Sequence, residues 1–289
     1  MKIIKINPQG FCSGVVQAIK IVEETLKNND IKKPIYMLGN IVHNKNVVEN
    51  FKNKGIIILE GESREKMLAT ISSGTIIITA HGASDNVKNI ALKRGLNIID
   101  ATCSNVNQTH HLIKEKIRDD YTIYYYGKKG HPETEGVLGI SPNIILITDK
   151  TNYNEIPIKN NKAFFTNQTT MSFFDVYKVY ESLKIRIPNL VLSEEVCNAT
   201  RKRQEAVISY KNKIDLCIVV GDVLSNNTRK LKDIALENNM QAILVESAEQ
   251  LSSFNLSKFK IIGVTAGAST PSYIVNEIIL FLKGKGYTL

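Results

Sequence analysis

Three cysteines divide the chain into parts of almost equal length, and this spacing restricts the possible folds more than any other feature. Cys12 and Cys103 lie 91 residues apart, and Cys103 and Cys197 lie 94 residues apart. Each cysteine directly precedes a segment with helical apolar spacing, as Val15 and Val22 show after Cys12. Each is therefore expected at the start of a helix, where the helix dipole favours a thiolate over a thiol.

Polar loops recur at corresponding positions in each third of the chain. Their most prominent side chains are, in chain order, His43 and His81, His131 and Thr169, and Ser225 and Ser269. The first of each pair follows its cysteine by 31, 28 and 28 residues, and the second by 69, 66 and 72 residues. This layout indicates an internal repeat of about 90 residues, visible in the order of features more than in identical letters.

Short apolar runs alternate with helix-length segments throughout the chain. The candidate strands are residues 2–6, 34–37, 56–59, 75–79, 97–99, 122–126, 144–147, 162–165, 190–192, 216–220, 241–245 and 260–264. Most are rich in Ile, Val and Tyr without strict alternation, as is typical of strands buried on both faces. Their alternation with helices predicts an α/β fold with parallel sheets.

The repeat and the strand pattern together predict three similar α/β units with small parallel sheets around a pseudo-threefold axis. The expected units are residues 14–102, residues 103–196, and residues 197–282 together with residues 1–13. In open parallel sheets, ligands collect beyond the carboxyl ends of the strands, where all of these polar loops are expected. We therefore expect one central site to which each unit contributes a cysteine and polar side chains.

Composition limits the classes of partner. The 289 residues include 37 Lys and Arg against 28 Asp and Glu, but the basic residues are scattered, without a basic run interleaved with aromatics. Nucleic acid is therefore not an expected partner, although the net charge of +9 would attract a small anionic substrate. No stretch approaches the roughly 18 consecutive apolar residues of a membrane span, and the first residues do not resemble a signal peptide. We expect a soluble cytoplasmic protein without a membrane partner.

Cysteine usage indicates metal ligands more than disulfides. Four cysteines in a chain without a secretory signal are expected to be reduced thiols. Single cysteines in three units lack the paired spacing of structural zinc sites and suit an iron–sulfur cluster better, although a three-cysteine zinc site stays an alternative. Three thiolates would leave one iron of a 4Fe–4S cluster open as a Lewis acid. Cys217 lies inside an apolar run and is interpreted as a small buried hydrophobe.

The polar loops offer side chains that could surround an anion. These are His43, His81, His131, Ser225, Asn227 and Ser269. Several would lie beside backbone N–H groups at helix starts, which is a ready phosphate site. Glu133 is the one acidic residue of this constellation. Near a cluster and an anion its pKa should be raised, which would make it a proton donor.

An ordered set of short motifs resembles those of the LytB family of 4-hydroxy-3-methylbut-2-enyl diphosphate reductases. The motifs are NPQGFCSGV at residues 7–15, VHN at 42–44, AHG at 80–82, DATC at 100–103, GHPE at 130–133, NQTT at 167–170, CNAT at 197–200 with RQEA at 203–206, and TAGAS at 265–269. They follow one another in family order and cover nearly the whole chain. One such motif would be weak evidence, whereas the ordered set is specific.

The resemblance implies a trefoil of three α/β domains around one 4Fe–4S cluster on Cys12, Cys103 and Cys197, with one iron open to the substrate hydroxyl. It implies that the substrate diphosphate is held by His43, His81, Ser225, Asn227 and Ser269, and Asn226 is expected to join them. The allylic hydroxyl would be surrounded by His131, Glu133 and Thr169, with Glu133 delivering protons. The reaction would be the two-electron reductive removal of that hydroxyl, giving isopentenyl and dimethylallyl diphosphates plus water. The electrons would come from a donor such as ferredoxin or flavodoxin.

Four positions depart from the family pattern. Gln9 and Ser104 stand where Arg and Pro are common, and the other two positions lie near the expected anion site. Asn226 stands where a second serine is usual, and its amide can still donate a hydrogen bond. Asp222 stands where glycine or another small residue is common, and it adds a negative charge near the expected anion site.

Two other functions stay open from the sequence alone. One is a hydro-lyase with a three-cysteine cluster, which would need no external electrons. The other is a non-catalytic iron–sulfur sensor, which would not need His131, Glu133 or Thr169.

Overall fold

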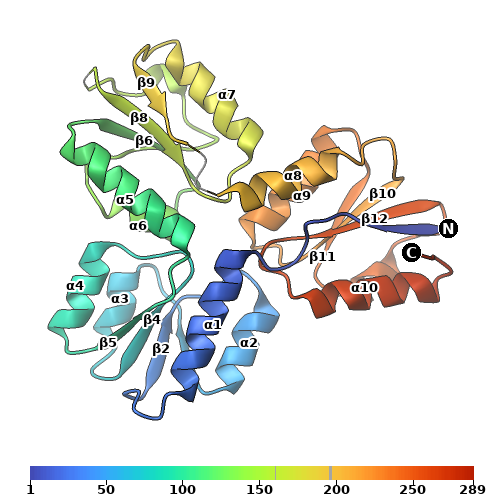
Figure 1. Cartoon of the computed structure of the whole chain (residues 1–289), viewed down its shortest axis with the longest axis horizontal. Coiled ribbons are helices and arrows are strands. Elements are labelled where there is room, and N and C mark those ends of the chain that lie inside the picture. The colour runs from blue at the N-terminus through green and yellow to red at the C-terminus, as the bar shows by residue number, and fades with distance from the viewer. Residues whose placement is uncertain (160, 195–196) are drawn as a thin grey trace. The chain divides into compact units, whose positions relative to one another are not determined.

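Three parallel sheets of four strands each make up the computed structural model, which describes residues 1–159, 161–194 and 197–289 (Figure 1). The chain divides into two compact units. The terminal unit consists of Met1–Val15, His43–Val47 and Asn198–Leu289, and the middle unit consists of Val16–Val42 and Val48–Cys197. The terminal unit contains one sheet, and the middle unit contains two.

The sheet of the terminal unit has the strand order β1-β12-β10-β11. Its elements are β1 (Lys2–Lys5), α8 (Asn198–Ile208), β10 (Leu216–Val220), α9 (Asn226–Glu237), β11 (Ala242–Val245), the short helix η2 (Glu249–Ser253), β12 (Ile261–Ala266) and α10 (Ser272–Gly284). Strand β10 is buried along its whole length because apolar side chains cover both faces of the sheet. Ile218 and Val264 pack against α10 on one face, while Val219 packs with Leu231 of α9 on the other.

The first sheet of the middle unit has the order β3-β2-β4-β5. Its strands and helices are α1 (Ser13–Lys27), β2 (Ile35–Leu38), α2 (Lys45–Asn53), β3 (Ile57–Leu59), α3 (Arg64–Ala69), β4 (Thr75–Ile78), α4 (Asp85–Lys93) and β5 (Asn97–Asp100). The first three residues of α1 and of α2 belong to the terminal unit. The inner strand β4 is entirely buried, and its residues Ile76 and Ile78 pack against Leu68 of α3 and Ala91 of α4.

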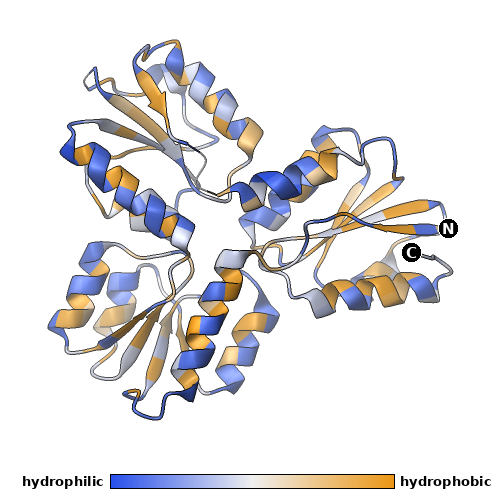
Figure 2. Cartoon of the chain, in the orientation of Figure 1, coloured by the Kyte–Doolittle hydropathy of each residue, from blue (hydrophilic) through white to orange (hydrophobic). Residues whose placement is uncertain are grey.

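The second sheet of the middle unit has the order β7-β6-β8-β9. Its elements are α5 (Ser104–Arg118), β6 (Thr122–Tyr126), α6 (Pro132–Leu138), β7 (Ile145–Ile147), the short helix η1 (Tyr153–Glu155), β8 (Ala163–Asn167), α7 (Phe173–Lys184) and β9 (Leu190–Leu192). Tyr124 and Phe165 pack with α7, and Tyr125 and Phe164 pack with Ile113 of α5. Figure 2 shows the resulting pattern of apolar strands and helices that are apolar on one side only.

The strands agree closely with those expected from the sequence. All twelve expected strands form, with ends that differ by at most two residues. The predicted α/β class with three small parallel sheets is confirmed. The boundaries of the three expected units stay a prediction, and the boundary at residue 196 lies outside the described residues.

Parallel pairing places the carboxyl ends of neighbouring strands at one edge of each sheet. Tyr126 of β6 lies beside Asn167 of β8, and Val220 of β10 lies beside Ala266 of β12. The loops that leave these strands therefore start next to each other within their sheet, which is the usual place for a ligand site in such sheets.

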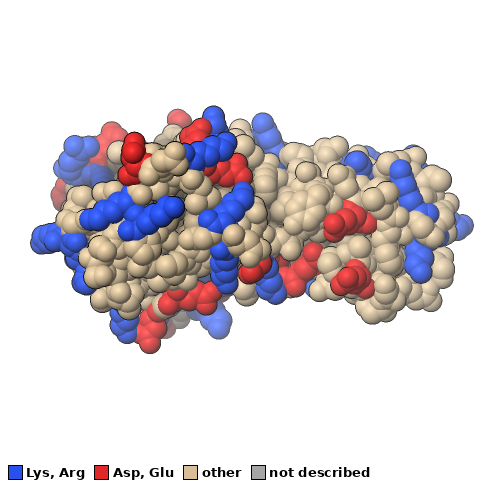
Figure 3. Space-filling view, turned by 90° about the horizontal axis from the view of Figure 1, so that it is seen from below, with Lys and Arg blue, Asp and Glu red and all other residues tan. Residues whose placement is uncertain are grey.

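Two surface properties bear on the class of partner. Among the described residues, none of the helices combines the length and the apolar character that crossing a membrane requires. On the face drawn in Figure 3, Lys and Arg side chains are mixed with Asp and Glu.

Candidate active site

Each of the three repeat-related cysteines lies at the start of a helix, as the sequence predicts. Cys12 directly precedes α1, Cys103 is the N-cap of α5, and Cys197 directly precedes α8. All three are half-buried thiols. The backbone N–H of Cys12 donates to the carbonyl of Ala268 at 3.1 Å, and that of Cys103 donates to the carbonyl of Ala80 at 3.0 Å.

The same local arrangement therefore occurs twice, once in each unit. Ala80 precedes His81 in the loop after β4, and Ala268 precedes Ser269 in the loop after β12. In both cases the backbone N–H of a cysteine at a helix start donates a hydrogen bond to a polar loop at the carboxyl end of a strand. This correspondence is what a repeated structural unit would produce.

Cys217 has a different environment from the other cysteines. It lies on β10, is completely buried, and packs with Val219 and Leu231. Burial raises the pKa of its thiol to about 12, because the charged thiolate would lose its hydration. Cys217 thus has the properties of a small buried hydrophobe, as expected from its apolar sequence neighbours.

Glu133 is a buried carboxyl group near the start of α6. Only 1% of the residue is exposed. Its Oε1 accepts the backbone N–H of Thr169 at 2.7 Å, and its Oε2 accepts the Thr169 hydroxyl at 2.9 Å. Burial raises the pKa of Glu133 to about 7, and the two hydrogen bonds from Thr169 partly oppose this rise because they stabilise the carboxylate. A raised pKa was expected for this residue, and its cause in the structure is loss of hydration.

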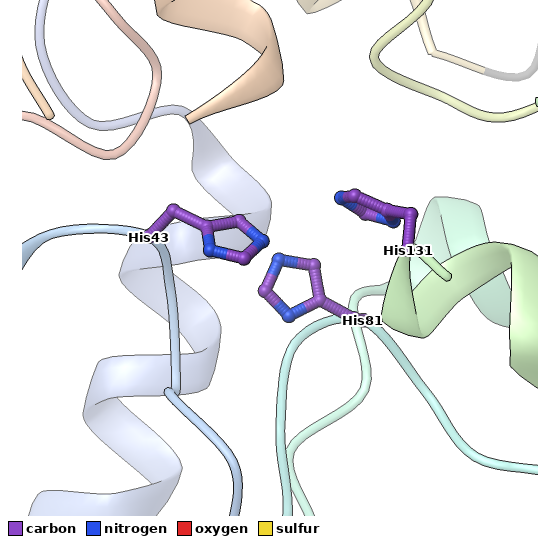
Figure 4. Close-up of side chains that lie close together, drawn as sticks. All are labelled: His43, His81 and His131. Atoms are coloured by element: carbon purple, nitrogen blue, oxygen red, sulfur yellow. The ribbon is translucent and has the colours of Figure 1, made fainter. Parts of the chain in front are cut away.

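His131 is the N-cap of α6 and lies two residues before Glu133. The Nδ1 atom of His131 accepts the backbone N–H of Glu133 at 3.2 Å, so the proton of the neutral ring lies on Nε2. The rings of His131 and His81 meet edge to face, with their centroids 5.3 Å apart (Figure 4). The middle unit therefore gathers His81, His131, Glu133 and Thr169, which lie in the loops after β4, β6 and β8 and in the first turn of α6.

Two serines and two asparagines are gathered in the terminal unit. Ser225 is the N-cap of α9, and its Oγ accepts the backbone N–H of Thr228 at 3.3 Å. Ser269 Oγ donates to the carbonyl of His43 at 3.0 Å and lies 3.4 Å from Ser225 Oγ. Asn226 and Asn227 form the first turn of α9 and are buried.

The amide of Asn227 is unusual for a buried polar group. The residue is 3% exposed, and within the described residues neither its Oδ1 nor its Nδ2 has a hydrogen-bond partner. Leaving a buried amide without partners is costly, so such a group calls for an explanation such as a ligand. Asn227 lies at a helix N-terminus beside Ser225, where backbone N–H groups also favour an anion.

Two glycines allow the loops after β10 and β12 to approach the start of α9. Gly221 has φ +145°, and a Cβ there would lie 2.5 Å from Thr270 Oγ1. A Cβ on Gly267 would lie 2.0 Å from Thr228 Oγ1. No larger residue fits at these positions without movement, because real Cβ atoms do not approach other atoms so closely.

Two arginines, the buried Arg203 and the half-buried Arg64, support the loops that carry the cysteines and histidines, and neither role was expected from the sequence. Arg203 of α8 is 4% exposed and donates to the carbonyl of Gly10 at 2.7 Å, two residues before Cys12. Arg64 of α3 donates to the carbonyl of Gly82 and to Thr79 Oγ1, on either side of His81. Burial lowers the pKa of Arg64 to about 10. The one available signal was the helical spacing behind Cys197, which places Arg203 with Ala206 and Val207.

Comparison with known proteins identifies the class. The family model described as LytB protein matches residues 3–283, and the chain belongs to this family. Its curated relatives are named 4-hydroxy-3-methylbut-2-enyl diphosphate reductase. The one from Lysinibacillus sphaericus is 43% identical over 284 residues, which are 98% of this chain and 88% of the relative. The one from Bacillus cytotoxicus is 45% identical over 285 residues, with 98% and 90% covered.

Solved structures agree with this assignment. The E-1-hydroxy-2-methyl-but-2-enyl-4-diphosphate reductase from Plasmodium falciparum is similar with a TM-score of 0.89 and 32% identity, covering 98% of this chain and 88% of that chain. A second structure, (E)-4-hydroxy-3-methyl-but-2-enyl diphosphate reductase, is described as the terminal enzyme of the non-mevalonate pathway. It is similar with a TM-score of 0.68 and 32% identity, covering 98% of this chain and all of that chain.

Proposed function

We propose that this chain is an iron–sulfur oxidoreductase that removes the allylic hydroxyl of 4-hydroxy-3-methylbut-2-enyl diphosphate, giving isopentenyl and dimethylallyl diphosphates. The observation that carries the proposal is the buried Glu133, whose pKa is raised to about 7 and whose carboxylate is held by Thr169. A sensor or a structural protein has no need for a buried acid that is half protonated near neutral pH. Such an acid suits proton delivery in a reaction.

The cysteines have the chemistry that an iron–sulfur cluster requires. Half-buried thiols lie at three helix starts, those of Cys12, Cys103 and Cys197. Cys217, by contrast, is completely buried on strand β10. Thiolates are the usual ligands of such clusters. We propose that Cys12, Cys103 and Cys197 hold one 4Fe–4S cluster, leaving one iron without a protein ligand. When bound, the cluster would supply electrons and a Lewis-acidic iron to the allylic hydroxyl.

The polar residues of the terminal unit suit the diphosphate. Ser225, Asn226 and Asn227 stand at the N-terminal end of α9, and Ser269 lies beside Ser225. Hydroxyl, amide and backbone N–H donors at a helix start stabilise phosphate oxygens. The unsatisfied amide of Asn227 would gain its missing partner from a phosphate oxygen. We assign diphosphate binding to these four residues together with His43 and His81.

The reaction consumes two electrons and two protons. The allylic C–O bond breaks, one proton joins the departing hydroxyl to form water, and the other joins the carbon skeleton. Glu133 is the proposed source of protons, because burial keeps a protonated fraction at pH 7. Thr169 and His131 orient it: Thr169 holds both carboxylate oxygens, and His131 fixes the first turn of α6 through Nδ1.

The two electrons must come from outside the chain. We propose a cytoplasmic donor such as ferredoxin or flavodoxin, in a compartment that keeps the thiol ligands reduced.

Product analysis under anaerobic conditions tests this function. The protein is reconstituted with iron and sulfide and incubated with the hydroxylated diphosphate, with and without a low-potential reductant. We expect isopentenyl and dimethylallyl diphosphates only when the reductant is present. Consumption of substrate without reductant would instead indicate a hydro-lyase, and an iron-loaded protein that turns over no substrate would overturn the proposal.

A further inference from the structure

Asp222 occupies an unexpected position within the terminal unit. It follows Gly221 at the end of β10 and is 4% exposed. From the sequence it is only an extra negative charge near an anion site. In the structure its carboxylate joins two segments that are 177 residues apart in the chain.

One oxygen of this carboxylate shapes the loop before α9. Oδ1 of Asp222 accepts the backbone N–H of Leu224 at 2.7 Å, and the Asp222 carbonyl accepts the backbone N–H of Ser225 at 3.0 Å. These bonds close a turn that delivers Ser225 to the N-cap position of α9. Ser225 and the two asparagines after it are proposed diphosphate ligands.

The other oxygen holds the segment that carries His43. Oδ2 of Asp222 accepts the backbone N–H of Lys45 at 3.2 Å. Lys45 is the first residue of α2, so its N–H has no partner inside the helix, and a carboxylate is favoured there. On the other side of this short segment, the His43 carbonyl accepts the hydroxyl of Ser269. The segment His43–Val47 is thus hydrogen-bonded to both Asp222 and Ser269.

A second carboxylate bridges the same two segments but contributes less. Oε1 of Glu246 accepts the backbone N–H of Val223 at 3.3 Å, and Oε2 lies 3.6 Å from Lys45 Nζ. The Lys45 side chain is 70% exposed, and ion pairs in water are worth little. The buried Asp222 is therefore the stronger of the two links.

We propose that Asp222 is a positioning residue for the diphosphate. Its hydrogen bonds fix the position of the segment His43–Val47 relative to the loop that leads to Ser225, before the substrate binds. This inference rests on the function proposed above. The negative charge of Asp222 is compensated by two N–H groups, so the side chain organises the anion site instead of repelling the anion.

Amide exchange and ligand binding test the role of Asp222 separately. The variants are Asp222→Ala, which removes both acceptors, and Asp222→Asn, which keeps an acceptor for Leu224 but not for Lys45. Asp233→Asn is the matched control, because Asp233 is an exposed aspartate on α9. The measurements are hydrogen–deuterium exchange over residues 43–47, calorimetric affinity for inorganic diphosphate, and kcat and KM of the reconstituted enzyme.

We expect both Asp222 variants to exchange the Lys45 amide about tenfold faster, to bind diphosphate about tenfold more weakly, and to raise KM by a similar factor with kcat within about twofold. The Asp233 variant should match the wild type. Unchanged or tighter diphosphate binding by Asp222→Asn would overturn the positioning role, since the charge would then act as repulsion. A wild-type protein that neither binds diphosphate nor reduces the substrate would overturn the proposed function itself, while the exchange data would still report on the Asp222 contact.

Discussion

The pKa of Glu133 gives a defined expectation for how turnover depends on pH. With a pKa of about 7, Glu133 is half protonated at pH 7, about one tenth protonated at pH 8 and about one hundredth at pH 9. If protonated Glu133 supplies the proton in the slow step, kcat should fall about tenfold per pH unit above 7. Glu133→Gln keeps the shape of the side chain but has no acidic proton to transfer. Its kcat should be lower by roughly 100-fold or more, without the falling limb.

The assay is an anaerobic profile of kcat between pH 5.5 and 9 with saturating substrate and an artificial reductant. Glu135→Gln is the matched control, because Glu135 lies on the same helix but is exposed. The control should keep the wild-type profile. A wild-type profile that stays flat through pH 9, or a Glu133→Gln enzyme with wild-type kcat, would refute the assignment of Glu133 as proton donor.

The same pKa has a consequence for stability. The pKa of Glu133 is raised from 4.5 to about 7 on folding, so the folded state binds a proton more tightly than the unfolded state. The contribution to stability is therefore fully present below pH 4.5 and is lost as pH rises to about 7. It amounts to roughly 3 kcal/mol of unfolding free energy. Urea unfolding should show wild-type stability falling relative to Glu133→Gln over this range, and parallel curves would contradict the raised pKa.

Three further substitutions test neighbouring features. Thr169→Val removes the hydrogen bond from the Thr169 hydroxyl that stabilises the Glu133 carboxylate, so the pKa of Glu133 should rise and the falling limb of the kcat profile should move to higher pH. A shift to lower pH would contradict this direction of the pKa change. Gly267→Ala places a Cβ 2.0 Å from Thr228 Oγ1 and should lower the unfolding free energy by about 1–3 kcal/mol in urea titration, whereas an unchanged midpoint would mean that the helix start yields freely. Cys217→Ala should cost about 1 kcal/mol of stability and leave the iron content unchanged, and loss of iron would make Cys217 a ligand.

The strands could be predicted because their sequences are unambiguous. Inner strands such as β10 and β6 are continuous apolar runs, and burial on both faces requires little more than that composition. The starts of α1 and α5 could be placed from the cysteines and the apolar spacing behind them. Strand ends were less certain, because β8 and β12 continue into polar residues such as Asn167 and Thr265. There the hydrogen bonding of a neighbouring strand decides where the strand ends.

The hydrogen bonds that hold the loops of the site in place could not be predicted, because they join segments that are far apart in the sequence. Arg203 reaches Gly10 across 193 residues, and Asp222 reaches Lys45 across 177. Neither pair has a local sequence pattern, since each bond joins a side chain to a backbone group whose position only the fold determines. For Glu133 the direction of the pKa change was predictable, and burial of the carboxyl group in the folded chain raises it.

The central claim is that three of the four cysteines hold an iron–sulfur cluster for a reductive reaction. The most direct measurement is the content of iron, acid-labile sulfide and zinc per chain after anaerobic purification, for the wild type, Cys103→Ser and Cys217→Ala. We predict about four iron and four sulfide in the wild type and in Cys217→Ala, and a marked loss of both in Cys103→Ser. One zinc per chain without sulfide, or full iron and sulfide in Cys103→Ser, would contradict the claim.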